Sequence, residues 1–193
     1  IGISVWEVID SATTKPFGYM PFYPGPGIGG HCIPLDPYYL ANKAREYDFH
    51  TRFIELAADI NEQMPHYVVS RIMEALNAKG KSLKGARVLV LGVSYKKDVE
   101  DIRESPSLKL IGLLRAKGAK VYYNDPYVSS VKISGNNLAS VGLRDRQLTS
   151  ADCVVIATDH TCYDYKHISQ RSGLVFDARG ATRKLRNKNI VRL

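Results

Sequence analysis

The sequence predicts an α/β protein in which helices, the last of them long, precede a doubly wound parallel sheet. Three observations support this prediction. Residues 85–193 alternate continuous apolar runs with helical segments, as parallel sheets covered on both faces do. Residues 52–78 repeat apolar side chains at spacings of three and four, which is typical of an amphipathic helix. Residues 15–40 are rich in proline and glycine, which favours a loop of fixed shape.

Composition is that of a globular protein. Hydrophobic residues make up 45% of the 193, enough to bury a core. No apolar run approaches the roughly 18 residues of a membrane helix and no signal peptide is visible, so we expect no membrane partner. The cysteines are few and widely spaced, which excludes a disulfide scaffold and favours a reducing, cytoplasmic location.

Positive charge gathers at the end of the chain. Lys and Arg number 27 and Asp and Glu 19, a net charge of +8, and no acidic residue follows Asp177. Such a tail can bind nucleic acid, but most basic runs are solvated ends. This tail also lacks the interleaved aromatic residues of single-strand binders, so we expect no nucleic-acid partner.

The first expected element is a helix over Ile3–Asp10, with Val5, Val8 and Ile9 on one face. The chain opens on Ile1 rather than Met, and nothing before this helix could act as its cap. We therefore expect a fragment of a longer protein.

A second helix should follow the loop. Asp36 is a suitable N-cap residue, Pro37 suits the first helical position, and Tyr38–Glu46 continues the helix.

The long helix over 52–78 should carry one stripe of side chains. The stripe consists of Ala57, Asn61, Met64, Val68, Ile72 and Leu76. Pro65 should kink or interrupt this helix, and Gly80 should end it. A helix of this length can connect two domains or pack against a copy of itself.

The remaining residues should form the sheet. Strands are expected at 87–92, 120–125, 152–158 and 173–177, with a helix from Ser105–Pro106 to Gly118. Ligands of such sheets bind beyond the carboxyl ends of the strands. That rule selects four segments: 94–97, 125–126, 158–160 and 178–180. No GxGxxG fingerprint is present, so cradling of a pyrophosphate by glycines is not expected here.

Cys32 is the candidate nucleophile. Glycines precede it, which lets a ligand approach closely, and a helix follows it, which favours a thiolate. A thiolate can add to a carbonyl and form a hemithioacetal or thioester. A buried, inert thiol is the commoner fate of a lone cysteine. The rigid loop around Cys32 raises the nucleophile to about equal weight with that alternative.

Asp36 can bind a reacting oxygen, orient a water or simply cap the helix. His31 is adjacent to Cys32 in sequence, and sequence neighbours seldom face each other, so no Cys–His dyad is inferred. We expect no metal site, because Cys32 and His31 lack a second closely spaced ligand pair. Cys153 lies in a core-like strand and Cys162 in a loop.

The segment 95–105 lies between a strand end and a helix start, where anions bind in this kind of fold. Lys96 and Arg103 are its candidate anion ligands. The alternative is a surface cluster of ion pairs, because acidic residues in the same segment balance the charge.

Three motifs resemble one family. Residues 24–37 (PGPGIGGHCIPLDP), 92–106 (GVSYKKDVEDIRESP) and 124–126 (NDP) resemble the UDP-glucose/GDP-mannose dehydrogenase family. Residues 17–26 (FGYMPFYPGP) look most like its UDP-N-acetylhexosamine 6-dehydrogenase branch, which acts in bacterial surface-polysaccharide synthesis.

This resemblance implies a domain organisation. Residues 1–82 would be a helical middle domain that carries the cysteine loop and forms a homodimer through the helix at 52–78. Residues 83–193 would be a Rossmann-like domain that binds the UDP-sugar. The family's NAD-binding domain would lie outside this chain.

The resemblance also implies a reaction and its residues. The family oxidises C6 of the sugar twice with NAD, through a cysteine thiohemiacetal and thioester. Cys32 and Asp36 match its catalytic cysteine and acid–base aspartate. The matches to substrate-binding residues are Tyr23, Gly29, Tyr95, Lys96 and Arg179. Arg103 matches an arginine that reaches NAD.

Parts of the family pattern are missing from this sequence. The glycine-rich NAD fingerprint is absent, and no Lys or Arg lies between Lys15 and Cys32 to match the arginine that some members donate across the dimer. We therefore expect this chain alone to bind NAD poorly and not to turn over. Two alternatives remain, a non-catalytic UDP-sugar-binding or dimerisation module and a UDP-glucose 6-dehydrogenase.

Overall fold

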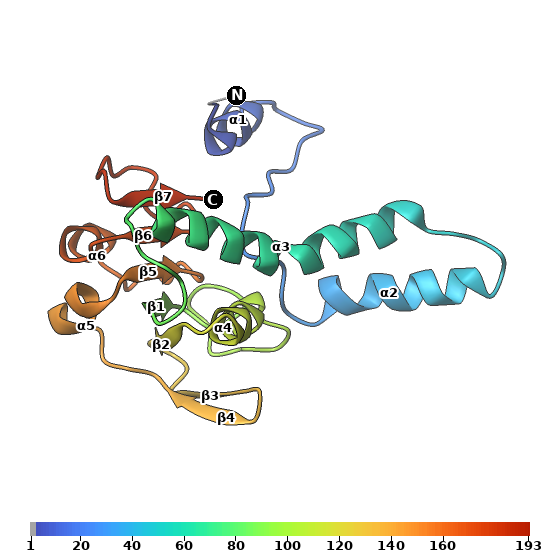
Figure 1. Ribbon diagram of the computed structural model, residues 1–193. Coiled ribbons are helices and arrows are strands. Elements are labelled where there is room, and N and C mark those ends of the chain that lie inside the picture. Colours follow the sequence, from blue (N-terminus) through green and yellow to red (C-terminus); the bar gives the residue numbers. More distant parts are fainter. Residues whose placement is uncertain (1–2) are drawn as a thin grey trace.

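The structure is a computed structural model that describes residues 3–193. Figure 1 shows α3 leading away from a sheet that is flanked by helices, with α2 beside the far part of α3. The helices are α1 (Val5–Ala12), α2 (Cys32–Arg45), α3 (Arg52–Asn77), α4 (Pro106–Ala116), α5 (Asp145–Ser150) and α6 (Tyr165–Arg171). The strands are β1 (Arg87–Leu91), β2 (Lys120–Asn124), β3 (Ser130–Ile133), β4 (Asn136–Ala139), β5 (Cys153–Ile156), β6 (Val175–Asp177) and β7 (Ile190–Arg192).

The parallel sheet is confirmed. Its order is β2-β1-β5-β6-β7, and every neighbouring pair is parallel. Successive side chains of a strand point to opposite faces, so Val88 and Val90 pack with α3 and α4 while Leu89 and Leu91 pack with α5 and α6. Burial on both faces explains the continuous apolar runs in the sequence. The β3–β4 hairpin and the edge strand β7 are elements that the sequence did not reveal.

The long helix α3 runs through Pro65 without interruption, although it changes direction about midway (Figure 1). A proline removes one helical hydrogen bond, here the one to the carbonyl of Asn61, so it bends the helix without breaking it. The second half of α3 buries Val68, Ile72 and Leu76 in the core of the sheet. Gly80 ends the helix as expected, with a φ of +67°. The core therefore includes residues on both sides of the expected boundary at 82/83.

Helix α1 is present, but the expected apolar face is wrong. Trp6 and Ile9 are buried, whereas Val5 and Val8 are exposed. The indole ring of Trp6 lies against Gly180, where a Cβ would come within 2.9 Å of the ring. The helix is therefore oriented by its tryptophan rather than by its valines.

Helix α2 begins at Cys32, five residues before the expected first residue Pro37, so Asp36 is not its N-cap. Pro34 is the third residue of the helix, where no intrahelical N–H bond is needed. Pro37 omits only the bond to Ile33, and the helix continues past it. No helix among residues 3–193 combines the length and the apolar character that crossing a bilayer requires.

Candidate functional site

The carboxyl ends of β1, β2 and β5 meet at a buried polar group of side chains. We call Ser94, Asp98, Asp125 and His160 the strand-end cluster. Ser94 and Asp125 are 1% and 4% exposed, and His160 is fully buried, whereas Asp98 lies at the surface. Buried polar groups of this kind must find hydrogen-bond partners within the protein.

Asp125 is the anchor of the cluster. Its Oδ2 accepts from the backbone N–H of Val93 at 2.7 Å and from Nε2 of His160 at 3.1 Å, and its Oδ1 accepts from the N–H of Tyr127 at 2.9 Å. Burial alone would raise the pKa of Asp125, but these donated hydrogen bonds outweigh burial and lower it to about 2. Asp125 is therefore a carboxylate at neutral pH.

His160 connects that anchor to the surface turn. Its Nδ1 accepts from the backbone N–H of Asp98 at 2.9 Å, and Asp98 Oδ1 in turn accepts from the N–H of Thr161 at 2.9 Å. Because Nδ1 is an acceptor, the proton of the neutral ring is on Nε2, which donates to Asp125. Lys96, two residues before Asp98, is exposed.

The glycines before Cys32 pack on Tyr95. A Cβ on Gly29 would lie 2.7 Å from Tyr95 Cβ, and one on Gly30 would lie 3.0 Å from the tyrosine ring. The N–H of Gly30 also donates to the carbonyl of Arg103 at 3.0 Å. Only glycine allows this approach, so the segment that leads to Cys32 is held against the loop after β1.

Arg179 joins the same segment from the end of β6. Its Nε donates to Asp159 Oδ1 at 3.2 Å, and its guanidinium lies where a side chain on Gly25 would be, 2.6 Å from that Cβ position. Asp177 fixes the turn by accepting from the backbone N–H of Arg179 at 3.0 Å.

Cys32 is the first residue of α2 and is exposed, and Asp36 is also exposed one helical turn later. Residues four apart lie on the same helix face, so these two side chains are neighbours. Burial raises the pKa of the other two thiols, that of Cys153 to about 12. Cys32 is therefore the thiol that is both exposed and at a helix N-terminus among residues 3–193.

Arg103 and Tyr23 have partners of their own. Asp101 accepts from Nε and Nη2 of Arg103, at 2.9 and 2.6 Å to Oδ2, and this hydrogen bonding raises the pKa of Arg103. Tyr23 lies with α1, where its hydroxyl donates to Asp10 at 2.7 Å and its ring stacks on Trp6.

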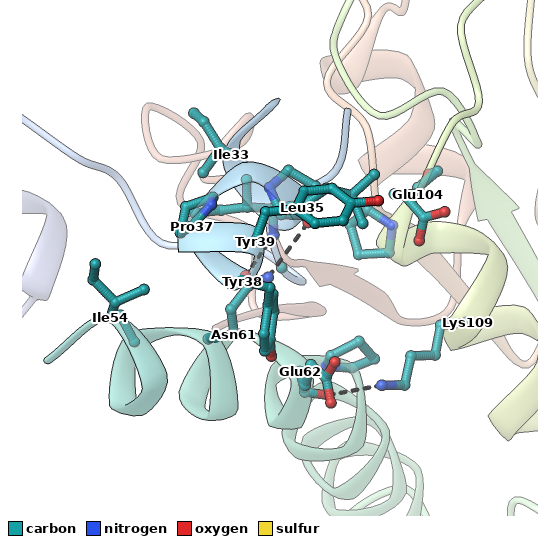
Figure 2. Close-up of a pocket in the computed structure, with 18 of the residues that line it drawn as sticks. Ile33, Leu35, Pro37, Tyr38, Tyr39, Ile54, Asn61, Glu62, Glu104 and Lys109 are labelled. Carbon is teal, nitrogen blue, oxygen red and sulfur yellow. Dashed lines mark hydrogen bonds between the residues drawn. The ribbon is translucent and has the colours of Figure 1, made fainter. Parts of the chain in front are cut away.

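A mainly apolar cavity of about 860 Å³ lies between α2, α3 and the start of α4. Figure 2 shows Ile54 on one side of it and Lys109 on the other, where Lys109 Nζ donates to the carbonyl of Glu62 at 3.1 Å. Cys32 and Asp36 are not among its lining residues. The cavity is therefore beside the cysteine segment rather than around the thiol.

One anchoring residue was missed by sequence reasoning. Asn61 Oδ1 accepts from the N–H of Ile28 at 2.6 Å and so fastens the loop to α3. Its position as a polar residue in the apolar stripe of α3 was the available signal. The described residues contain no group of three or more His, Cys, Asp or Glu arranged to hold a metal ion.

Comparison with known proteins decides the family. The central domain of the UDP-glucose/GDP-mannose dehydrogenase family matches residues 1–63, and its UDP binding domain matches residues 89–184. The chain belongs to this family. The two matched ranges contain the three motifs that resemble the family, at residues 24–37, 92–106 and 124–126.

Named members of the dehydrogenase family resemble nearly the whole chain. A UDP-N-acetyl-D-mannosamine dehydrogenase of Methanococcus vannielii is 34% identical over 99% of this chain and 40% of its own length. An NDP-N-acetyl-D-galactosaminuronic acid dehydrogenase of Ralstonia solanacearum is 32% identical over 93% of this chain and 41% of its own. The solved structure of the UDP-D-ManNAc dehydrogenase of Pyrococcus horikoshii has a TM-score of 0.83 and 31% identity, covering 99% of this chain and 44% of that one. The chain thus spans about two fifths of the length of these relatives.

Proposed function

We propose that this chain is the cysteine-bearing and nucleotide-sugar-binding portion of an NAD-dependent dehydrogenase. The whole protein would oxidise C6 of a UDP-N-acetylhexosamine to the uronic acid for surface-polysaccharide synthesis. One observation carries the proposal: the segment that ends at Cys32 packs on Tyr95 and Arg179, which come from two strand ends of the sheet. This packing supports the proposal because it brings the segment of Cys32 against two candidate ligand-binding residues. The names of two relatives, a UDP-N-acetyl-D-mannosamine dehydrogenase and an NDP-N-acetyl-D-galactosaminuronic acid dehydrogenase, support it as well.

In this proposal the cations and glycines recognise the nucleotide sugar. Lys96 and Arg179 lie beyond the ends of β1 and β6, where ligands of parallel sheets bind, and their charges suit a diphosphate. Gly29 packs on Tyr95, and these two residues would contact the sugar together. Tyr23 adds an exposed ring from the same segment.

Cys32 would capture the aldehyde. Its thiolate adds to C6, so a carbon–sulfur bond forms while the carbonyl oxygen takes up a proton. Oxidation of this adduct to the thioester would need the NAD of the whole protein as the hydride acceptor, with the hydroxyl proton released. A water oriented by Asp36 would then attack the carbonyl carbon. The carbon–sulfur bond then breaks, which releases the carboxylate and regenerates the thiolate.

The turn after β1 has no GxGxxG sequence, and Thr158 fills the space where a Cβ on Gly92 would lie. The guanidinium of Arg103 is paired with Asp101. We therefore assign no step within this chain to NAD. We propose that the cofactor is bound mainly by residues of the whole protein beyond this span.

Self-association through α3 is part of the proposal. Phe53, Leu56 and Ile60 are 89%, 54% and 54% exposed on its first half. An apolar helix face of this kind favours burial against a second copy. Light scattering is expected to give a dimer mass, and Phe53→Glu combined with Ile60→Glu is expected to give a monomer. A monomeric wild-type chain would count against this role of α3.

The decisive experiment is a calorimetric titration with UDP, with CMP as the control ligand. We expect UDP-specific binding that weakens about tenfold or more in Lys96→Ala, because a charge-assisted contact is lost. Lys97→Ala removes the same charge one residue away and should bind as the wild type does. Equal losses in both variants, or no binding by folded protein, would contradict the assignment of Lys96.

A further inference from the structure

We propose that His160 and Asp125 are positioning residues that set the place of Lys96 through the backbone of the turn between Ser94 and Asp98. The inference rests on the proposed function, because it assigns a purpose to the turn that carries the proposed UDP-binding lysine. In this inference neither side chain contacts the ligand, because both are buried.

The backbone is fastened on both sides of Lys96. On one side, the N–H of Ser94 donates to Asp125 Oδ2 at 3.2 Å, and the carbonyl of Ser94 accepts from Thr158 Oγ1 at 2.7 Å. On the other side, the N–H of Asp98 donates to His160 Nδ1 at 2.9 Å. Three strand ends, those of β1, β2 and β5, thus hold a span of five residues.

No side-chain contact fixes the position of Lys96. It is exposed, and within residues 3–193 it has no hydrogen-bond or ion-pair partner. Its position therefore follows from its backbone. A fixed backbone limits the space that the ammonium group searches and so reduces the ordering needed when an anion binds.

Asp98 has a backbone conformation that this tether supports. Its φ is +61°, a left-handed conformation that side-chain-bearing residues seldom adopt without support. The support is a reciprocal pair of bonds, from the Asp98 N–H to His160 and from the Thr161 N–H to Asp98 Oδ1. Loss of the His160 acceptor would leave the N–H without a partner and allow the turn to relax.

The two nitrogen atoms of His160 have separable roles, and two substitutions can remove them one at a time. His160→Gln keeps a donor near the Nε2 position for Asp125 but has no acceptor at the Nδ1 position. His160→Asn places its amide oxygen near the Nδ1 position for Asp98 but does not reach Asp125. His167→Gln is the matched control, because His167 pairs with Asp145 through Nε2 at an exposed site.

Two readouts are measured on the full chain, the dissociation constant for UDP and amide hydrogen exchange over residues 94–101. We expect His160→Gln to weaken UDP binding about tenfold and to speed exchange in the turn. His160→Asn should stay within about threefold of the wild type in both, although it loses more thermal stability. His167→Gln should change neither.

The outcomes separate this inference from the proposed function. If wild-type protein does not bind UDP, the proposed function fails, and the exchange rates still decide whether His160 holds the turn. Unchanged exchange in His160→Gln, or a greater loss of binding in His160→Asn than in His160→Gln, would overturn the inference. If His160→Gln does not fold, amide exchange at Asp98 in the wild-type protein tests the same bond, because an N–H held by His160 Nδ1 should exchange more slowly than the N–H of its exposed neighbour Lys97. Exchange at Asp98 as fast as at Lys97 would then overturn the inference.

Discussion

Two regions border the candidate site and are built in opposite ways. The proline–glycine segment, residues 15–31, projects large apolar side chains outward, and Phe17 and Phe22 are 83% and 75% exposed. The strand-end cluster does the reverse, since Asp125 and His160 are polar and almost fully buried. The first region is shaped by residues that restrict or free the backbone, and the second by hydrogen bonds between side chains and backbone.

This difference indicates how each region responds to change. Hydrogen bonds hold the strand-end cluster within the sheet domain, so it should keep its shape without a ligand. The proline–glycine segment is held at a few points, such as Asn61 and Arg179, and its aromatic side chains remain exposed. Reagents and substrates should therefore reach Cys32 readily. The substitutions that destabilise the fold most should lie around the strand-end cluster.

The largest contrast should be in thiol reactivity. Burial raises the pKa of Cys153 from 9.0 to about 12, which makes its thiolate about a thousandfold scarcer at a given pH. Cys32 is exposed at the start of α2. With iodoacetamide and peptide mass spectrometry, we expect Cys32 to be modified at least about a hundredfold faster than Cys153. Labelling of Cys153 at a similar rate in folded protein would mean that the sheet opens as readily as the loop.

A pair of glycine substitutions compares the two regions directly. Gly92 and Gly18 have φ values of +83° and +74°, so alanine is strained at both by roughly 1–2 kcal/mol. A Cβ on Gly92 would also collide with Thr158, 2.7 Å from its carbonyl oxygen, whereas a Cβ on Gly18 meets nothing within 4 Å. Gly92→Ala should lower the free energy of unfolding by about 3 kcal/mol or more, and Gly18→Ala by about 1. Equal losses of unfolding free energy in the two variants, measured by urea unfolding, would contradict the expected difference between the two regions.

The sheet was predictable because its strands are buried on both faces, which leaves continuous apolar runs such as 87–92. The edge strand β7 was not, since its three residues are only half-buried. The start of α2 was misplaced because Pro34 is typical of loops and Pro37 of a first helical position, whereas both lie within α2 at positions that a helix tolerates.

The strand-end positions of Asp125 and His160 were predictable, but the hydrogen bonds that connect them to the turn were not. The rule that ligands bind beyond strand ends selected Asp125 and His160. The bond from the Asp98 N–H to His160 joins residues 62 apart in sequence, and it depends on which ring nitrogen faces the turn. No spacing pattern encodes that choice. Similarly, Asn61 reaches Ile28 only because α3 and the loop pack together.

The strand-end cluster should also be sensitive to acid. The pKa of Asp125 is lowered from 3.8 to about 2 in the folded protein, so its ionised form stabilises the fold by about 2 kcal/mol above pH 4. That contribution is present above the unfolded-state pKa and is lost as pH falls from about 4 through 2, because the folded carboxylate must then be protonated. Asp125→Asn should remove this part of the pH dependence of urea unfolding and lower stability at pH 7. Asp145→Asn makes the same charge change at an exposed carboxylate and controls for net charge. If the loss of stability below pH 4 is unchanged in Asp125→Asn, the cluster does not depend on the charge of Asp125. The cluster would then differ from the proline–glycine segment in packing alone.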